Sequence, residues 1–91
     1  MSDMTEQILF SGQVQGVGFR WTTQRIASRL ALRGFVRNLP DGCVEAVVAG
    51  SAAGIQQLIA KLRERFGSGI TDVQRQTLEG ANDFAGFTIR K

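Results

Sequence analysis

Apolar side chains recur at alternate positions near the N-terminus, at Ile8, Phe10 and Val14. A period of two is typical of a strand that buries one face, and Gly12 interrupts this one. We therefore predict a first strand that is preceded by a loose tail over residues 1–5 and followed by a glycine-rich turn.

After that turn the apolar period becomes helical. The apolar positions at helical spacing are Phe19, Ile26, Ala27 and Leu30. The spacing predicts a first helix over Trp21–Arg33, which we expect Gly34 to end, because glycine is common just past a helix C-terminus.

A second helix is predicted after Ser51, whose hydroxyl can cap a helix N-terminus. Its apolar positions lie three and four residues apart, as in a helix with one buried face. They are Ile55, Leu58, Ile59, Leu62 and Phe66. Gly67 follows and is the expected end of this helix.

Strands are predicted on both sides of the second helix. Gly34–Asn38 and the valine-rich Cys43–Ala49 form a hairpin across residues 39–42, where proline and glycine suit a tight turn. Ile70–Leu78 is the fourth strand and Phe87–Ile89 is a short final one.

The order of these elements is β-α-β-β-α-β plus a short extra C-terminal strand, which predicts an α+β ferredoxin-like sandwich. Right-handed crossovers place both helices on one face of a largely antiparallel sheet. Gly80–Gly86 forms a loop between the last two strands. With 91 residues, 43% of them hydrophobic, the chain is expected to be a single domain over residues 6–91.

Two residue types limit the possible chemistry. Histidine is absent and Cys43 is the single cysteine, which excludes a Ser-His-Asp triad, His-ligated zinc and thiolate clusters. The lone cysteine and the lack of a signal-like or membrane-length apolar run lead us to expect a cytoplasmic protein with no membrane association.

The formal charge of +3 and the isoelectric point of about 10.0 suit an anionic partner. Arg25, Arg29 and Arg33 recur every four residues, a spacing that lines them along one helix face. We interpret this stripe as a solvated face in preference to a nucleic-acid surface.

The segment between the first strand and the first helix is the main candidate for chemistry. Its glycines Gly12, Gly16 and Gly18 allow backbone N–H groups to converge as an anion nest in front of a helix N-terminus. Arg20 follows and could hold a phosphate with its fork of donors. The P-loop and dinucleotide motifs do not fit, so nucleotide binding is disfavoured, and by spacing alone the segment could equally be a plain turn.

The same residues resemble the signatures of a known family. Phe10–Arg20, FSGQVQGVGFR, resembles the first signature of the acylphosphatase family, with Phe10 where an aliphatic residue is more usual. Gly34–Asn38 resembles the second signature, and its later members are Gly42, Val44 and Gly50. The resemblance covers nearly the whole chain.

The resemblance implies a small enzyme that hydrolyses acyl phosphates to a carboxylate and inorganic phosphate without a metal or a cofactor. By this resemblance, Asn38 would position the attacking water and the side chain of Arg20 would bind the phosphoryl group. The backbone cradle for the phosphate would be formed by Gln15, Gly16, Val17, Gly18, Phe19 and Arg20.

These implied roles are chemically sufficient. The leaving carboxylate is the conjugate base of an acid with a pKa of about 4, so no general acid is needed. The amide of Asn38 does not titrate near neutrality and would orient the water without acting as a base. The proton of the water would then pass to a phosphate oxygen of the substrate.

Other functions remain compatible with this fold. An RNA-binding module of the same element order expects aromatic residues on its central strands, and residues 43–48 contain none. A non-catalytic anion-binding domain, or the start of a larger hydrogenase-maturation carbamoyltransferase, would have the same pattern, although a free-standing monomer is expected here. We assign Phe19 to the core. Trp21 is either half buried or lines the cleft against an aryl substrate, and the half-buried position is preferred.

Overall fold

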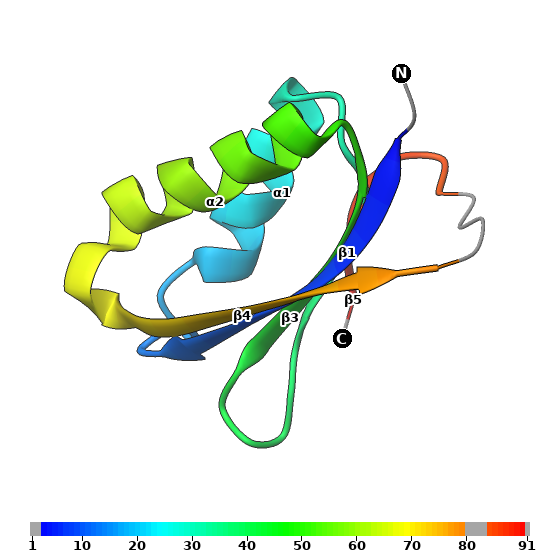
Figure 1. Cartoon of the computed structure of the whole chain (residues 1–91). Helices are drawn as coiled ribbons and strands as arrows, with labels where there is room; N and C mark the ends of the chain where they lie inside the picture. Colours follow the sequence, from blue (N-terminus) through cyan, green and yellow to red (C-terminus); the bar gives the residue numbers. More distant parts are fainter. Residues whose placement is uncertain (1–2, 80–83, 91) are drawn as a thin grey trace.

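A computed structural model of the chain describes residues 3–79 and 84–90. It confirms the predicted order of helices and strands (Figure 1). In chain order the elements are β1 (Met4–Gly12), α1 (Phe19–Arg29), β2 (Arg33–Asn38), β3 (Val44–Gly50), α2 (Ala52–Phe66), the 3-10 turn η1 (Gly67–Gly69), β4 (Ile70–Leu78) and β5 (Phe87–Arg90).

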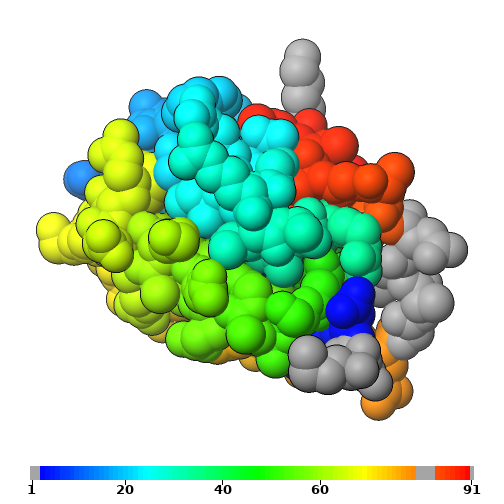
Figure 2. All heavy atoms as spheres, turned by 90° about the horizontal axis from the view of Figure 1, so that it is seen from above, coloured from blue at the N-terminus to red at the C-terminus, as the bar shows by residue number. Residues whose placement is uncertain are grey.

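The strands form a single sheet in the order β4-β1-β3-β2-β5. All neighbours are antiparallel except β2 and β5, which pair in parallel. Both helices cover the same face of the sheet (Figure 1), and in the view from above they lie side by side, α1 in cyan and α2 in green to yellow (Figure 2). The fold is the predicted α+β ferredoxin-like sandwich.

The hydrophobic core fills the space between the helices and the sheet. Phe10 is fully buried, and its ring centroid lies 5.0 Å from that of Phe19, which in turn lies 4.8 Å from that of Phe66. The core position of Phe19 is thus confirmed, and the unusual Phe10 packs into a row of three aromatic rings. The apolar face predicted for α2 is buried as well, at Ile55, Leu58, Ile59 and Leu62.

The first helix ends at Arg29, so the prediction that it extends to Arg33 was wrong. Ala31 has a φ of 56° and lies in the left-handed region. The N–H of Leu32 donates to the carbonyl of Ala27 at 2.9 Å, and the N–H of Ala31 donates to that of Ser28 at 3.2 Å. These two bonds are those of a Schellman termination, formed here around an alanine in place of the expected glycine.

Gly34, which we expected to end the helix, lies inside β2. Its φ is 138°, and a Cβ built there would lie 1.8 Å from the carbonyl oxygen of Val47 on β3. Glycine is therefore required at this position by the close approach of two strands and not by the end of a helix.

The remaining differences concern element ends. β1 begins at Met4, so Met4 and Thr5 belong to the sheet and not to the expected tail, and β3 begins at Val44, one residue after the predicted start. Residues 80–83 of the predicted loop lie outside the described residues, as do residues 1, 2 and 91.

Within 3–79 and 84–90, no helix combines the length and the apolar character needed to cross a membrane.

The helix end at Ala31 generates a stability prediction. The left-handed conformation costs a residue with a Cβ about 1–2 kcal/mol, and the greater chain entropy of glycine offsets part of the gain. We expect Ala31→Gly to raise the free energy of unfolding by about 0.5–1 kcal/mol in urea denaturation. The matched control is Ala60→Gly, exposed within α2, which should lower it by about 1 kcal/mol. Similar losses at both positions would contradict this account of the helix end.

Candidate active site

The turn between β1 and α1 is held in place where it leaves the sheet. The N–H of Gln13 donates to the carbonyl of Gly69 in η1 at 2.8 Å. Gly12 has a φ of 119°, and a Cβ there would lie 2.2 Å from the same oxygen of Gly69. The close contact between the end of β1 and η1 therefore requires glycine at position 12 and fixes the start of the turn.

Left-handed glycines shape the turn itself. Gly16 and Gly18 have φ angles of 78° and 79°, while Val17 between them does not have a positive φ. A Cβ at either glycine would meet nothing within 4 Å, so glycine is needed for the backbone conformation and not for space. Such alternation is typical of anion-binding nests. Within the described part of the chain, the N–H groups of residues 15–20 donate no hydrogen bond to a backbone carbonyl.

Helix α1 begins directly after the turn, with an N-terminus that lacks a side-chain cap. Its N-cap is Gly18, whose carbonyl accepts from the N–H of Thr22 at 3.0 Å, and no acidic residue lies in the first turn. The first N–H groups of the helix and the positive end of its dipole are therefore available to an anion.

A cleft of about 170 Å³ lies between the turn, the start of α1, the end of β2 and β5. It contains Arg20 and Asn38, the two residues assigned to catalysis from the sequence. Of the predicted cradle, Gln15 and Val17 do not line it. The complete lining consists of Val14, Gly16, Gly18, Phe19, Arg20, Trp21, Asn38 and Ile89.

Asn38 is the last residue of β2 and shares a strand face with the buried Val36. Its Oδ1 atom is buried and accepts no hydrogen bond from the part of the chain that the structure describes. An unpartnered buried acceptor costs about 1–3 kcal/mol and is rare in folded proteins. An acceptor of this kind in the lining of a cleft suits a ligand that brings its own donor.

Among the residues that the structure describes, the guanidinium of Arg20 makes one weak hydrogen bond. Its Nη1 donates to the carbonyl of Arg90 on β5 at 3.5 Å. The three ion pairs among residues 3–79 and 84–90 involve other arginines, and no carboxylate in that part of the chain neutralises Arg20. These pairs are Arg33–Asp3, Arg37–Glu45 and Arg75–Glu6.

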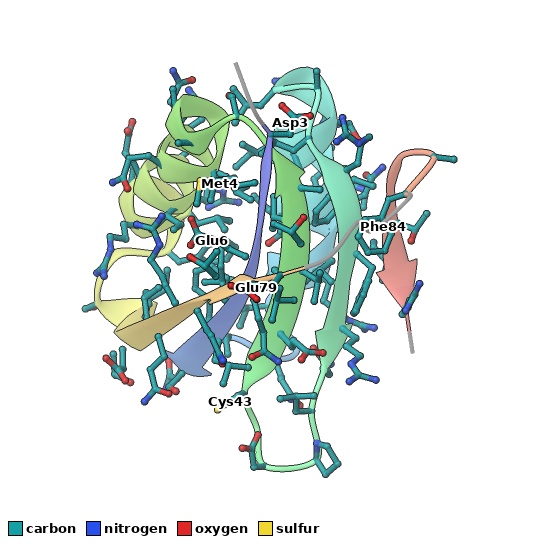
Figure 3. The ribbon with its side chains drawn as sticks, turned by 45° about the vertical axis from the view of Figure 1, so that its right-hand side comes forward. Asp3, Met4, Glu6, Cys43, Glu79 and Phe84 are labelled. Carbon is teal, nitrogen blue, oxygen red and sulfur yellow. The ribbon has the colours of Figure 1, made fainter. Side chains whose placement is uncertain are left out.

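The side chain of Gln15 fastens the turn to the hairpin that carries Asn38. Its Nε2 donates to the carbonyls of Leu39 and Cys43, at 2.8 and 2.9 Å. Figure 3 shows Cys43 where the hairpin returns to β3, at the same end of the sheet as the end of β1. The sequence placed Gln15 only in the cradle, because nothing local to it indicates the distant carbonyls.

Trp21 is 57% exposed and lines the cleft, so the preferred prediction of a half-buried side chain away from the cleft was wrong. Phe19 and Thr23 are buried on the core side of α1, and at 100° per residue Trp21 lies on the opposite side. The helical spacing could have placed Trp21 on the exposed side of α1 from the sequence alone. The prediction instead followed the size and apolar character of tryptophan. Ile89 was predicted in a strand, but the sequence had no signal for the place of that strand beside the turn.

Acidic and sulfur ligands do not gather near this cleft. Across 3–79 and 84–90, no three or more His, Cys, Asp or Glu side chains are arranged to hold a metal ion. Arg20 is the one lining residue whose side chain carries a charge.

The fold and the cleft define a class of protein, a ferredoxin-like sandwich with a glycine-rich, positively polarised turn between its first strand and first helix. The acylphosphatase family model matches residues 6–89. An acylphosphatase of Nitrobacter hamburgensis is 43% identical over 82 residues, 90% of this chain and 83% of the relative. One of Caldivirga maquilingensis is 41% identical over 91 residues, 98% of this chain and 96% of the relative.

The solved structures agree with this match. The crystal structure of acylphosphatase from Bacillus subtilis has a TM-score of 0.89 at 29% identity, with 97% of this chain and 99% of that chain covered. The chain therefore belongs to the acylphosphatase family and is a hydrolase of acyl phosphates.

The contacts of Gln15 predict a large effect of a small substitution. Gln15→Glu replaces the amide donor with a carboxylate that faces two carbonyl oxygens, so we expect the free energy of unfolding at pH 7 to fall by about 2–3 kcal/mol. The control Gln13→Glu makes the same change at an exposed side chain, where the effect should stay within about 0.5 kcal/mol. Urea denaturation measures both, and equal effects would show that Gln15 does not fasten the hairpin.

Proposed function

We propose that this chain hydrolyses the carboxyl–phosphate bond of acyl phosphates in the cleft between the turn, Arg20 and Asn38, without a metal ion or a cofactor. The observation that carries the proposal is the buried, unpartnered Oδ1 of Asn38, which lies in the lining of the same cleft as Arg20 and the uncapped N-terminus of α1.

The phosphoryl group is bound by the backbone N–H groups of residues 15–20 and by the guanidinium of Arg20. In phosphoryl transfer, negative charge spreads over three equatorial oxygens, and donors already in position stabilise it without reorganising. The turn suits this requirement because the N–H of Gln13 fixes its start against η1 and the side chain of Gln15 attaches it to the hairpin.

The attacking water is oriented by Asn38. Its Oδ1 accepts a hydrogen bond from the water, which directs a lone pair of the water oxygen toward phosphorus. The new P–O bond forms as the bond to the acyl oxygen breaks, and the carboxylate leaves with the bonding electron pair. The proton of the water passes to a phosphoryl oxygen, because an amide is not a base near neutrality.

The leaving group explains why the cleft functions without an acid. A carboxylate is already stable as an anion at neutral pH, since its conjugate acid has a pKa of about 4. Among the lining residues there is no carboxylate, thiol, imidazole or amine that could donate or accept a proton. The chemistry therefore depends on position and charge.

The assigned roles are tested with benzoyl phosphate as substrate in excess chelator. Wild type should remain active, and Arg20→Ala and Asn38→Ala should each lower kcat/KM by at least about 100-fold, as expected when a donor or a positioning group of the transition state is lost. The matched control is Arg29→Ala, exposed on the same helix, which should retain wild-type activity.

Circular dichroism would confirm that each variant is folded. Full activity in either variant would overturn that residue's role, and loss of wild-type activity in chelator would overturn the metal-free reaction.

The same mechanism predicts the pH dependence. The cleft lining contains no group that titrates near neutrality, so kcat for benzoyl phosphate should be constant between about pH 5 and 8, after correction for the ionisation of the substrate measured by its own titration. A rise or fall of kcat with pH that persists after this correction would reveal an enzyme acid or base and contradict proton transfer to the substrate.

A further inference from the structure

Large apolar side chains are exposed mainly beside the cleft. In the part of the chain that the structure describes, three large hydrophobic residues are exposed, namely Val17 at 50%, Trp21 at 57% and Ile89 at 42%. Trp21 and Ile89 line the cleft, and Val17 lies between its lining residues Gly16 and Gly18. Scattered exposed apolar residues are ordinary, whereas a group at one site indicates a binding surface.

Trp21 and Ile89 come from different elements and are held at a fixed spacing. Ile89 pairs with Val36 in β2, two residues before Asn38. Gln24 of α1 donates through Nε2 to the carbonyl of Phe87 at 3.4 Å, and Arg20 donates to that of Arg90 at 3.5 Å. The pairing of β5 with β2, together with these two long hydrogen bonds to α1, places Ile89 next to the helix that carries Trp21.

The indole ring of Trp21 is supported from within its own helix. The Cζ of Arg25 lies 4.8 Å from the ring centroid, within the range of a cation–π contact. Arg25 is one turn further along α1, on the side away from the turn that precedes the helix. A ring that is already ordered loses less conformational entropy when a ligand contacts it.

The size of the cleft determines where an acyl group can lie. A volume of about 170 Å³ is smaller than the roughly 300–1,000 Å³ of pockets that enclose a whole organic ligand. Once a phosphoryl group occupies the turn, an acyl group larger than acetyl must extend onto the rim of the cleft, where Trp21 and Ile89 are exposed.

We propose that Trp21 and Ile89 form an acyl-binding rim that makes aromatic and bulky apolar acyl phosphates better substrates than acetyl phosphate. This inference rests on the proposed function, because the phosphoryl group must occupy the turn for the acyl group to reach the rim. Both residues determine specificity and take no part in the bond changes at phosphorus.

The kinetic test compares benzoyl phosphate with acetyl phosphate. In wild type kcat/KM should be at least about tenfold higher for benzoyl phosphate. Trp21→Ala should lower this ratio about five- to tenfold through the KM for benzoyl phosphate, and Ile89→Ala about threefold, with acetyl phosphate changed less than about twofold. Trp21→Phe should restore part of the ratio. The control is Thr88→Ala, next to Ile89 on the opposite face of β5, which should leave the ratio unchanged.

A binding test needs no catalysis, because Trp21 is the only tryptophan of the chain and its fluorescence reports directly on the cleft. The probes are benzoylmethylphosphonate and acetonylphosphonate, in which a methylene replaces the bridging oxygen. Both should change the fluorescence in a saturable way, with the aryl compound binding about tenfold more tightly. Ile89→Ala should weaken the aryl compound alone, whereas Arg20→Ala should weaken both.

The results of these two tests distinguish the acyl-binding rim from the proposed hydrolysis. If Trp21→Ala leaves the ratio of the two substrates unchanged, or the two phosphonates bind equally, the rim is overturned while the proposed function stands. If wild type hydrolyses neither substrate but Ile89→Ala still loses the preference for the aryl phosphonate, the rim is supported and the proposed function is overturned.

Discussion

The antiparallel pairing of β1 with β3 is the constraint on which the site depends. Because Phe10 at the end of β1 lies opposite Val44 at the start of β3, the turn that leaves β1 and the turn that enters β3 meet at the same end of the sheet. Arg20 and Asn38 are brought together in this way, although neither lies on either strand. The two hydrogen bonds of Gln15 then convert this proximity into a fixed geometry.

Within residues 3–79 and 84–90, the one buried side-chain polar atom without a hydrogen-bond partner lies at this end. Helix α2 has an ordinary start, in which the hydroxyl of Ser51 accepts from the N–H of Gly54 at 3.0 Å. Helix α1 starts from a glycine without such a cap, and the Oδ1 of Asn38 lies nearby without a donor. A folded chain that keeps donors and an acceptor unpaired around one cleft gives up stability there, and a bound phosphoryl group and a water would restore the missing hydrogen bonds.

The sequence predicted the fold well because strand and helix periods are local properties, and the two signatures identified Arg20 and Asn38 as candidates. What it missed depends on contacts between distant segments. Ala31 adopts a conformation that favours glycine because two helix-terminal hydrogen bonds hold it there. The exposure of Trp21, the partners of Gln15 and the position of Ile89 each depend on where another element packs, and a single sequence does not report this.

The site also has a place in the order of folding. The paired residues of β1 and β3 are 34 to 46 positions apart, from Phe10 with Val44 to Met4 with Gly50, and contacts at such separations form late because a long loop must close first. The two hydrogen bonds from Gln15 to Leu39 and Cys43 can form only when β1 is paired with β3. The cleft therefore requires contacts between segments far apart in the sequence, whereas each helix is built from hydrogen bonds between residues close together.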